Sequence, residues 1–457
     1  MKPGKRSTPH DAQGLEAAAR VIAAGGRVPK KFAKARPASA GPTLGAATAS
    51  AKITPARRVA FEILTLVGEQ KGHSDELLHG VRTDDLSEPD RHLATALVMG
   101  VLRWQIALDA LIRKYLQRPD QRLAGSVALV LRLGAFQLLH MDRIPAHAAL
   151  SESVEMCRAA GQPHAAGMVN AILRKIATAP KPKEPIFETT AAFAERLGHP
   201  LWLVERWVEQ YGRTAALGIC EADQREPATG GLFAPDETLP QVDDGSRLVA
   251  ELTAEAMPRV EGRAARVWDC CAAPGGKTLV LAARLPEAEL LATDVSAKRL
   301  ALLQSRFRRV PQAARIKTQI ADATKLPEAV GRFDLILCDV PCSGTGTLGR
   351  NPEIRARLQP EELSRQAERQ CTILTEALCR LAPGGRLVYS TCSLEPEENE
   401  QVIAKAASGY ERISVADFLS GIPGFVGDPS AMVRDGALRT LPGVDPCDGF
   451  YAVVLAG

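Results

Sequence analysis

The sequence predicts an α/β domain with a mostly parallel sheet, preceded by an all-helical domain. Apolar residues recur at the helical period from Thr54 to about Ala177, for example between Met168 and Ile176. Beyond Val267, short apolar strands alternate with helices, as in parallel sheets that carry helices on both faces. The 457 residues also exceed what one core usually supports, so more than one domain is expected.

The N-terminal segment, residues 1–51, is rich in Ala, Gly, Pro, Lys and Arg and has few large apolar groups. It cannot bury enough surface to offset the entropy of ordering, so we expect a disordered basic tail. Residues 1–52 hold ten basic and two acidic side chains. Because this excess of positive charge is larger than the net charge of the whole chain, +4, the remaining residues are slightly acidic. Affinity for nucleic acid must therefore come from local patches or from the tail, which is either a solvated extension or a basic arm.

Turns and prolines divide the rest of the chain. Turn signals at 87–90 and 144–145 separate the helices of the first domain, and three alternating prolines within 179–185 favour an extended linker. Helical patterning resumes over 190–221. The predicted organisation is a basic tail (1–51), an all-helical domain (52–178), a linker (179–189), a helical connector (190–263) and an α/β domain (264–457).

The α/β domain is expected to contain short apolar strands, each followed by a turn or a helix. Ligands of such sheets bind at the carboxyl ends of the strands. The residues that follow each strand are therefore the candidates for a functional site. The expected strands cover 267–268, 290–293, 316–320, 333–338, 386–390 and 450–455.

The cysteines and the N-terminus indicate a cytoplasmic protein. Ten cysteines form neither a disulfide framework nor a CxxC pair, which is typical of reduced, intracellular chains. The N-terminus has basic residues but no apolar core before a cleavage site, and we expect no apolar run of the ~18 residues that a membrane span needs. The predicted protein is soluble and has no membrane partner, and its oligomeric state stays unknown.

A glycine-rich turn, DCCAAPGGKT at 269–278, follows the first expected strand and opens a helix. Its glycines let the backbone approach a ligand, and the helix N-terminus supplies free N–H groups. It is not the GxGxxG dinucleotide pattern, and a phosphate loop would need a glycine where Cys271 stands. Taken alone, such a turn is as often structural as ligand-binding.

Three acidic residues lie at the ends of consecutive expected strands, namely Asp294, Asp322 and Asp339. A single acid in such a place is ordinarily a helix cap, but three at one sheet edge indicate a ligand. Asp294 follows the turn by about 20 residues, the spacing of an acid that holds ribose hydroxyls. Carboxylates can also accept from an adenine amino group or stabilise a nearby cation.

Two cysteines, Cys342 and Cys392, follow strand ends at this same edge, among turn and hydroxyl residues. Cysteine in such a place is a candidate nucleophile. Metal ligation is not expected, because the spacing lacks CxxC pairs and histidine partners. The other cysteines are expected to be small buried apolar groups, namely Cys157, Cys220, Cys270, Cys338, Cys371, Cys379 and Cys447.

At these motifs the sequence resembles the Nop/Sun (Fmu, RsmB-type) family of RNA cytosine-5 methyltransferases. The resemblance rests on DCCAAPGGKT (269–278), DVPCSGTGTLGRNPEI (339–354) and STCSLEPEENE (390–400), and covers roughly 264–455. The helical block 54–177 looks like the NusB-type RNA-binding domain of the bacterial 16S rRNA branch. The implied fold is a Rossmann-like class I methyltransferase domain preceded by a NusB-like domain.

The resemblance implies methylation of carbon 5 of a cytosine in RNA, with 16S rRNA as the expected substrate and S-adenosyl-L-methionine as methyl donor. Carbon 5 is a poor nucleophile, so a thiolate must first add at carbon 6 and turn the ring into an enamine. By resemblance, Cys392 is that nucleophile, Cys342 assists elimination and release, and Asp339 hydrogen-bonds the base. DNA cytosine-5 methyltransferases carry the nucleophile in a Pro-Cys motif, here Cys342, so the Thr-Cys-Ser motif favours the RNA class. The implied cofactor contacts are Cys271, Ala272, Ala273, Pro274, Gly275, Gly276, Lys277, Asp294, Asp322 and Asp339.

One segment departs from the family pattern. Members typically carry an RNA-binding insert of several strands after a proline, whereas here Pro227 is followed almost at once by residues 242–246. Much of that insert is therefore expected to be absent. Two alternatives stay open. The first is the same chemistry on tRNA or another RNA. The second is a non-catalytic RNA-binding assembly factor with a vestigial methyltransferase fold.

Overall fold

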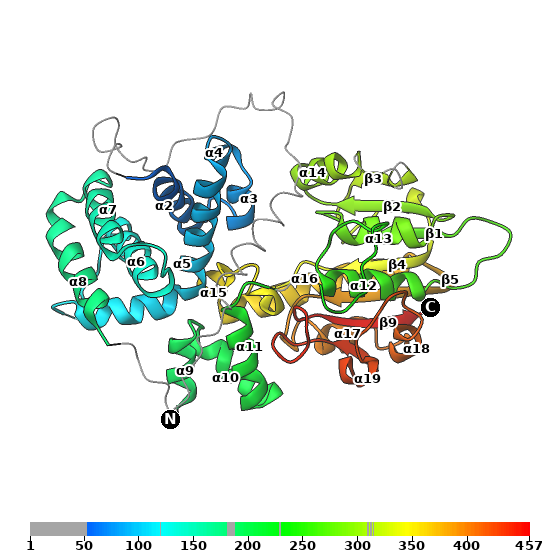
Figure 1. Cartoon of the computed structure of the whole chain (residues 1–457). Helices are drawn as coiled ribbons and strands as arrows, with labels where there is room; N and C mark the ends of the chain where they lie inside the picture. The colour runs from blue at the N-terminus through cyan, green and yellow to red at the C-terminus, as the bar shows by residue number, and fades with distance from the viewer. Residues whose placement is uncertain are drawn as a thin grey trace, which may run out of the picture. The chain divides into compact units, whose positions relative to one another are not determined.

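The chain forms two compact units in the computed structural model (Figure 1). The first contains Met1–Gly212 and Asn351–Arg355, and the second contains Arg213–Arg350 and Ala356–Gly457. The boundary at Gly212 falls inside the segment expected as a helical connector. The expected basic tail and most of the expected linker lie outside the described residues, which are 53–118, 120–180, 188–227, 230–308, 310, 313 and 315–457.

The described part of the first unit is helical throughout, in agreement with its 3.6-residue period. Its core is formed by apolar side chains such as Ile63, Leu97, Leu131 and Leu173, all fully or almost fully buried. The helices are α2 (Pro55–Gly68), α3 (Ser74–Leu78), α4 (Val81–Asp84), α5 (Glu88–Tyr115), α6 (Gly125–His140), α7 (Ala146–Ala159), η3 (Pro163–Ala165), α8 (Ala166–Thr178), α9 (Thr190–Arg196) and α10 (Leu201–Tyr211).

Helix α5 is long and apolar enough to cross a membrane by length and composition, the one such helix in the described chain. The expectation that no segment would reach this threshold was therefore wrong. Its side chains Leu97, Val98 and Val101 belong to the helical core. Core helices pass the same test, so α5 is weak evidence for a membrane span.

The short segment Asn351–Arg355, from the range expected to be entirely α/β, belongs to the first unit. The backbone N–H and the hydroxyl of Ser74 donate to the buried carboxylate of Glu353 at 3.1 and 2.9 Å. Arg355 donates to the carbonyl of Arg103 at 2.7 Å. The chain thus leaves the second unit within the 339–354 motif, at Asn351, and returns to it at Ala356.

A mixed sheet organises the second unit, in the order β3-β2-β1-β4-β5-β9-β8-β7, with β6 paired to β9. Strands β1 to β5 pair in parallel and β9 is antiparallel to β5, which confirms a mostly parallel α/β sheet. The short strands β6, β7 and β8 were not predicted. The strands are β1 (Arg266–Asp269), β2 (Glu289–Asp294), β3 (Lys317–Ile320), β4 (Phe333–Asp339), β5 (Leu381–Thr391), β6 (Glu411–Ile413), β7 (Val433–Arg434), β8 (Ala437–Arg439) and β9 (Tyr451–Ala456).

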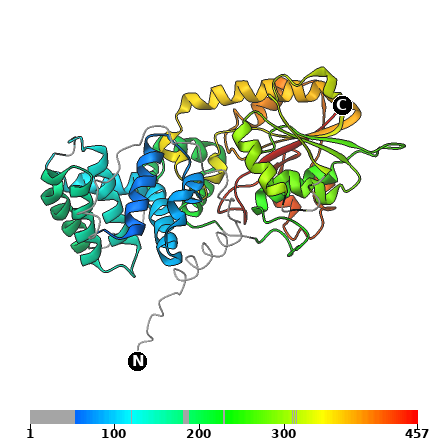
Figure 2. The ribbon, with the colours of Figure 1, turned by 90° about the horizontal axis from the view of Figure 1, so that it is seen from above.

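Helices cover both faces of this sheet, so its central strands are buried on both sides (Figure 2). Leu335 and Leu337 of β4 pack with α12 and α13, whereas Ile336 and Cys338 of the same strand pack with α16 and α17. The helices of this unit are α11 (Arg213–Asp223), α12 (Asp244–Glu255), α13 (Gly276–Arg284), α14 (Ala297–Phe307), η5 (Glu328–Val330), η6 (Thr345–Thr347), α16 (Pro360–Cys379), α17 (Glu400–Ala406), α18 (Ala416–Leu419) and α19 (Pro429–Met432), while α15 (Ile354–Arg357) crosses the unit boundary.

The segment in which the family insert was expected to be missing holds little β structure. Between Gly230 and β1, the described residues form helix α12 and one isolated bridge between Phe233 and Phe425, and none belongs to a strand of the sheet. The shortening of the RNA-binding insert stays a prediction.

Candidate active site

The glycine-rich turn joins β1 to α13 at the carboxyl edge of the sheet. Gly275 has a φ of 97°, a conformation that favours glycine, and a Cβ added there would lie 3.0 Å from the side chains of Leu303 and Phe307. A Cβ on Gly276 would lie 2.7 Å from Val242. Backbone rather than side chains therefore forms this part of the edge, at the N-terminus of α13.

The predicted acidic residues differ in their surroundings. Asp294 ends β2, is buried, accepts from the N–H of Ser296 at 2.8 Å and lies 3.4 Å from Arg299. Asp322 does not end its strand, because β3 stops at Ile320. Its carboxylate instead accepts from the hydroxyl and the N–H of Thr324 at 2.7 and 3.0 Å, which lowers its pKa. The prediction of three strand-end acids was therefore wrong for Asp322.

Asp269 also ends a strand, β1, and the sequence singled it out only as the first letter of a motif. One carboxylate oxygen accepts from the hydroxyl of Thr278 at 2.6 Å, and the other, Oδ1, is buried without a hydrogen-bond partner. Burial raises the pKa of Asp269 to about 7. Its position after a buried apolar strand was the signal that could have identified it.

The two candidate cysteines lie side by side, with their Sγ atoms 3.4 Å apart. Parallel pairing of β4 with β5 sets Asp339 opposite Ser390 and brings the loops after both strands to one edge. Both side chains are partly exposed. The hydrogen bond with Cys392, burial and nearby negative charge raise the pKa of Cys342 well above its ordinary value.

Asp339 and Lys277 form an ion pair beside these thiols, with Nζ and Oδ2 2.9 Å apart. The hydroxyl of Ser390 donates to Asp339 at 2.7 Å, and Lys277 lies 3.2 Å from the Ser246 hydroxyl and 5.3 Å from the centre of the Phe450 ring. Burial opposes the charge on Lys277, but the neighbouring carboxylates raise its pKa above the ordinary value. Lys277, predicted only as a cofactor contact, thus links the glycine-rich turn to the thiols.

Three segments meet around Gly346, four residues after Cys342. The N–H of Gly346 donates to the carbonyl of Cys392 at 2.9 Å, and the N–H of Gly449 donates to the carbonyl of Gly346 at 2.8 Å. Asp448 forms an ion pair with Arg350, yet burial still raises the pKa of Asp448 to about 6. The C-terminal segment before β9 therefore closes against the loop of Cys392.

Comparisons with known proteins identify the family of the chain. Residues 259–456 match the family of the 16S rRNA methyltransferase RsmB/F, and residues 54–178 match the NusB family. The probable ribosomal RNA small subunit methyltransferase B of Bacillus subtilis is 30% identical, in an alignment that covers 88% of this chain and 98% of that relative. The chain belongs to the RsmB/F family of methyltransferases.

Other RsmB/F relatives show the same extent of similarity. The ribosomal RNA small subunit methyltransferase B of Klebsiella pneumoniae (strain ATCC 700721) is 31% identical over 80% of this chain and 90% of its own length. A crystal structure of PH0851 covers 89% of this chain and 99% of its own, with a TM-score of 0.68 and 21% identity, and so shares the fold. The predicted family, the α/β fold behind a NusB helical domain and the methyltransferase class are confirmed.

Most remaining cysteines of this RsmB/F chain are buried as predicted. Cys157, Cys220, Cys270 and Cys338 are buried, whereas Cys371 and Cys447 are partly exposed. The prediction was wrong for Cys379, which is exposed at the last position of α16. No group of three or more His, Cys, Asp or Glu side chains in the described chain could hold a metal ion.

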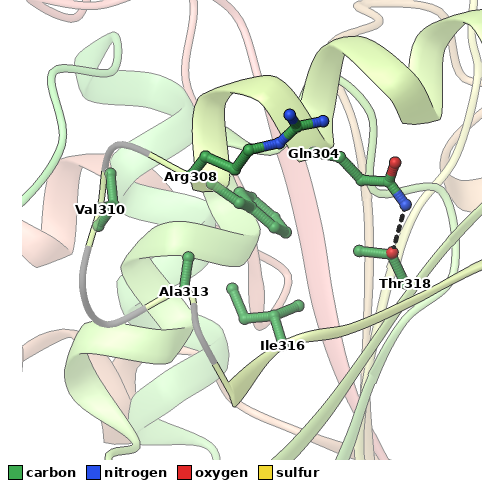
Figure 3. A pocket seen from close by; sticks show the side chains of 7 residues that line it. Gln304, Arg308, Val310, Ala313, Ile316 and Thr318 are labelled. Atoms are coloured by element: carbon green, nitrogen blue, oxygen red, sulfur yellow. Dashed lines mark hydrogen bonds between the residues drawn. The ribbon is translucent and has the colours of Figure 1, made fainter.

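A separate hollow of about 470 Å³ lies between α14 and β3 (Figure 3). Gln304 of the helix donates to the hydroxyl of Thr318 on the strand at 2.7 Å across this hollow. None of the predicted RsmB/F site residues lines it, so it is not the candidate active site. Its lining residues are Gln304, Phe307, Arg308, Val310, Ala313, Ile316 and Thr318.

Proposed function

We propose that this enzyme transfers a methyl group from S-adenosyl-L-methionine to carbon 5 of a cytosine in 16S rRNA. The observation that carries the proposal is the pair of thiols, Cys342 and Cys392, at a separation of 3.4 Å next to the Lys277–Asp339 ion pair. Methyl transfer to oxygen or nitrogen needs no thiol, whereas carbon 5 of cytosine needs a nucleophile at carbon 6. The RsmB/F match and the rRNA methyltransferase names of the relatives support the same substrate class.

The residues at the sheet edge fit the proposed cofactor. The unpartnered buried Oδ1 of Asp269, the backbone cradle at Gly275 and Gly276 and the buried carboxylate of Asp294 offer polar groups to an adenosine and an amino acid. S-adenosyl-L-methionine supplies an electrophilic methyl group when it is bound. The residues proposed to hold it are those of the turn, Cys271, Ala272, Ala273, Pro274, Gly275, Gly276 and Lys277, together with Asp294, Asp322 and Asp339.

In the proposed reaction, the thiolate of Cys392 forms a bond to carbon 6 of the cytosine. The electron pair of the C5–C6 double bond moves toward carbon 5, which then forms its bond to the methyl group. The sulfur of the bound cofactor would keep the electron pair of its broken bond to that methyl group, and S-adenosyl-L-homocysteine would leave. Asp339, held in place by Lys277 and Ser390, accepts a hydrogen bond from the base. Nucleophilic attack by Cys392 and the hydrogen bond from the base to Asp339 require both side chains at the edge where the parallel strands end.

Release of the product reverses the first bond. The thiolate of Cys342 removes the proton from carbon 5, the C5–H electron pair restores the C5–C6 double bond, and Cys392 leaves carbon 6 with its own pair. Cys342 must first lose its own proton to solvent, and the adduct favours this loss, because bonding to carbon 6 removes the Cys392 thiolate that is the main cause of the raised pKa of Cys342. Cys342 then carries the proton that carbon 5 has lost.

The substrate is tested by bisulfite sequencing of 16S rRNA from a strain that lacks the gene. We expect at least one cytosine to lose its methylation and to regain it with the wild-type gene but not with Cys392→Ser. An unchanged methylation map would count against 16S rRNA as the substrate. A map restored by Cys392→Ser would count against the nucleophile.

A different RNA substrate is the second candidate, favoured by the segment after Pro227, where the described residues from Gly230 to β1 add no strand to the sheet. A Cys342→Ala variant should retain the covalent adduct and so capture its substrate. Sequencing of RNA that stays attached after denaturation should return 16S rRNA. Recovery of tRNA or another RNA instead would move the chemistry to that substrate, and recovery of none would favour a non-catalytic assembly factor.

A further inference from the structure

The two cysteine-bearing loops share a buried carboxylate that the proposed reaction leaves without a task. Glu398 lies within the 390–400 motif and is 0% exposed. Its Oε1 accepts from the N–H of Ser343 at 2.8 Å and from the amide of Gln370 at 2.9 Å. Its Oε2 accepts from the hydroxyl of Ser393 at 2.5 Å and from that of Ser343. Four neutral donors therefore hold this carboxylate.

These contacts join Glu398 to the two loops that carry the thiols. Ser343 is the residue after Cys342, and Ser393 is the residue after Cys392. Their hydroxyls also lie 3.0 Å from each other, so both serines and Glu398 form one buried group. The two cysteines are 50 positions apart in the sequence and sit on separate loops, so their separation depends on what joins those loops.

Glu398 is itself held in place from two further elements. Its backbone carbonyl accepts from the hydroxyl of Tyr389 on β5 at 2.6 Å, and Gln370 comes from helix α16. The neighbouring Asn399 accepts from the hydroxyl of Thr391 at 2.6 Å and donates to the carbonyl of Ser393 at 2.8 Å. Hydrogen bonds to an ionised acceptor are stronger than neutral ones, and burial strengthens them further.

We propose that Glu398 is a positioning residue for methyl transfer, which ties the loop of Cys342 to the loop of Cys392 and keeps the two thiols adjacent. This inference rests on the proposed function, because the adjacent thiols matter only if both act on one base. The carboxylate also acts electrostatically, since its negative charge is one of the groups that raise the pKa of Cys342.

The test compares Glu398→Gln with Glu400→Gln. Glutamine keeps the size of the side chain but replaces a charged acceptor by an amide, while Glu400 is exposed and pairs with Arg439, away from both serines. With rRNA substrate and cofactor at saturation, we expect Glu398→Gln to lower the methylation rate about 10- to 100-fold, because small misplacements of reacting groups have costs of this size. The KM for RNA should change little. The variant should stay folded with a lower melting temperature, because some of the four donors lose their acceptor, and Glu400→Gln should match the wild-type rate. A wild-type rate in Glu398→Gln would overturn the proposal.

A second measurement needs no RNA and so separates this proposal from the proposed function. In a Cys392→Ser background, iodoacetamide alkylation of Cys342 is followed against pH, with and without Glu398→Gln. Loss of the carboxylate charge should move the alkylation midpoint to lower pH, whereas a merely structural role would leave it unchanged. An unchanged midpoint would overturn the role of Glu398, while an inactive wild type with a shifted midpoint would overturn the methylation proposal alone.

Discussion

Substitution of Gly346 by alanine should disable the site by displacing backbone. A Cβ at this position would lie 2.2 Å from the carbonyl oxygen of Gly449 and 2.9 Å from that of Cys392. Ordinary contact begins near 3.4 Å, so one segment must move by about 1.2 Å to relieve the shorter contact. Both neighbours are backbone atoms, which cannot rotate away as a side chain could. We expect Gly346→Ala to lower the free energy of unfolding by about 1–3 kcal/mol, the usual range for overpacking.

The same displacement should also slow the chemistry. A shift of about 1 Å in a reacting group can reduce a rate about 100-fold, and the carbonyl of Cys392 is one of the two backbone groups that the added Cβ would crowd. The assay is single-turnover methylation of 16S rRNA, together with thermal unfolding. The matched control is Gly409→Ala, because a Cβ on Gly409 meets nothing within 4 Å. Wild-type rate and stability in Gly346→Ala would refute the close approach of these segments.

Three further changes test other parts of the site and its support. Lys277→Met removes the ion pair with Asp339 and should reduce single-turnover methylation strongly while the protein stays folded by circular dichroism. Because burial raises the pKa of Asp269 to about 7, the folded state favours its protonated form, and stability should fall as pH rises from about 4 to 7. Asp269→Asn should flatten that part of the pH profile of urea unfolding, and an unchanged slope would argue against the shift. Leu374→Ala, at a fully buried position of α16, should lower the free energy of unfolding by about 2–5 kcal/mol, which denaturant titration measures.

The sequence predicted the parts of the fold that depend on local pattern. The longer helices of the first unit follow the apolar period, and β2, β4 and β5 contain apolar runs, because strands buried on both faces need apolar side chains. The very short strands β6 to β8 carry too few residues for such a pattern. The expected strand 316–320 and β3 both end at Ile320, so the error for Asp322 was to count a residue two positions beyond the strand as its end.

The sequence by itself determined which chemistry is present at the edge of the sheet. Asp339 ends β4, Cys342 and Cys392 follow β4 and β5, and parallel strands bring their carboxyl ends to the same side. Only the tertiary structure decided how these groups pair. The contacts of Lys277 with Asp339, of Cys342 with Cys392 and of Glu398 with two serines join residues far apart in the chain. Such contacts depend on strand order and loop conformation, which local periodicity does not specify.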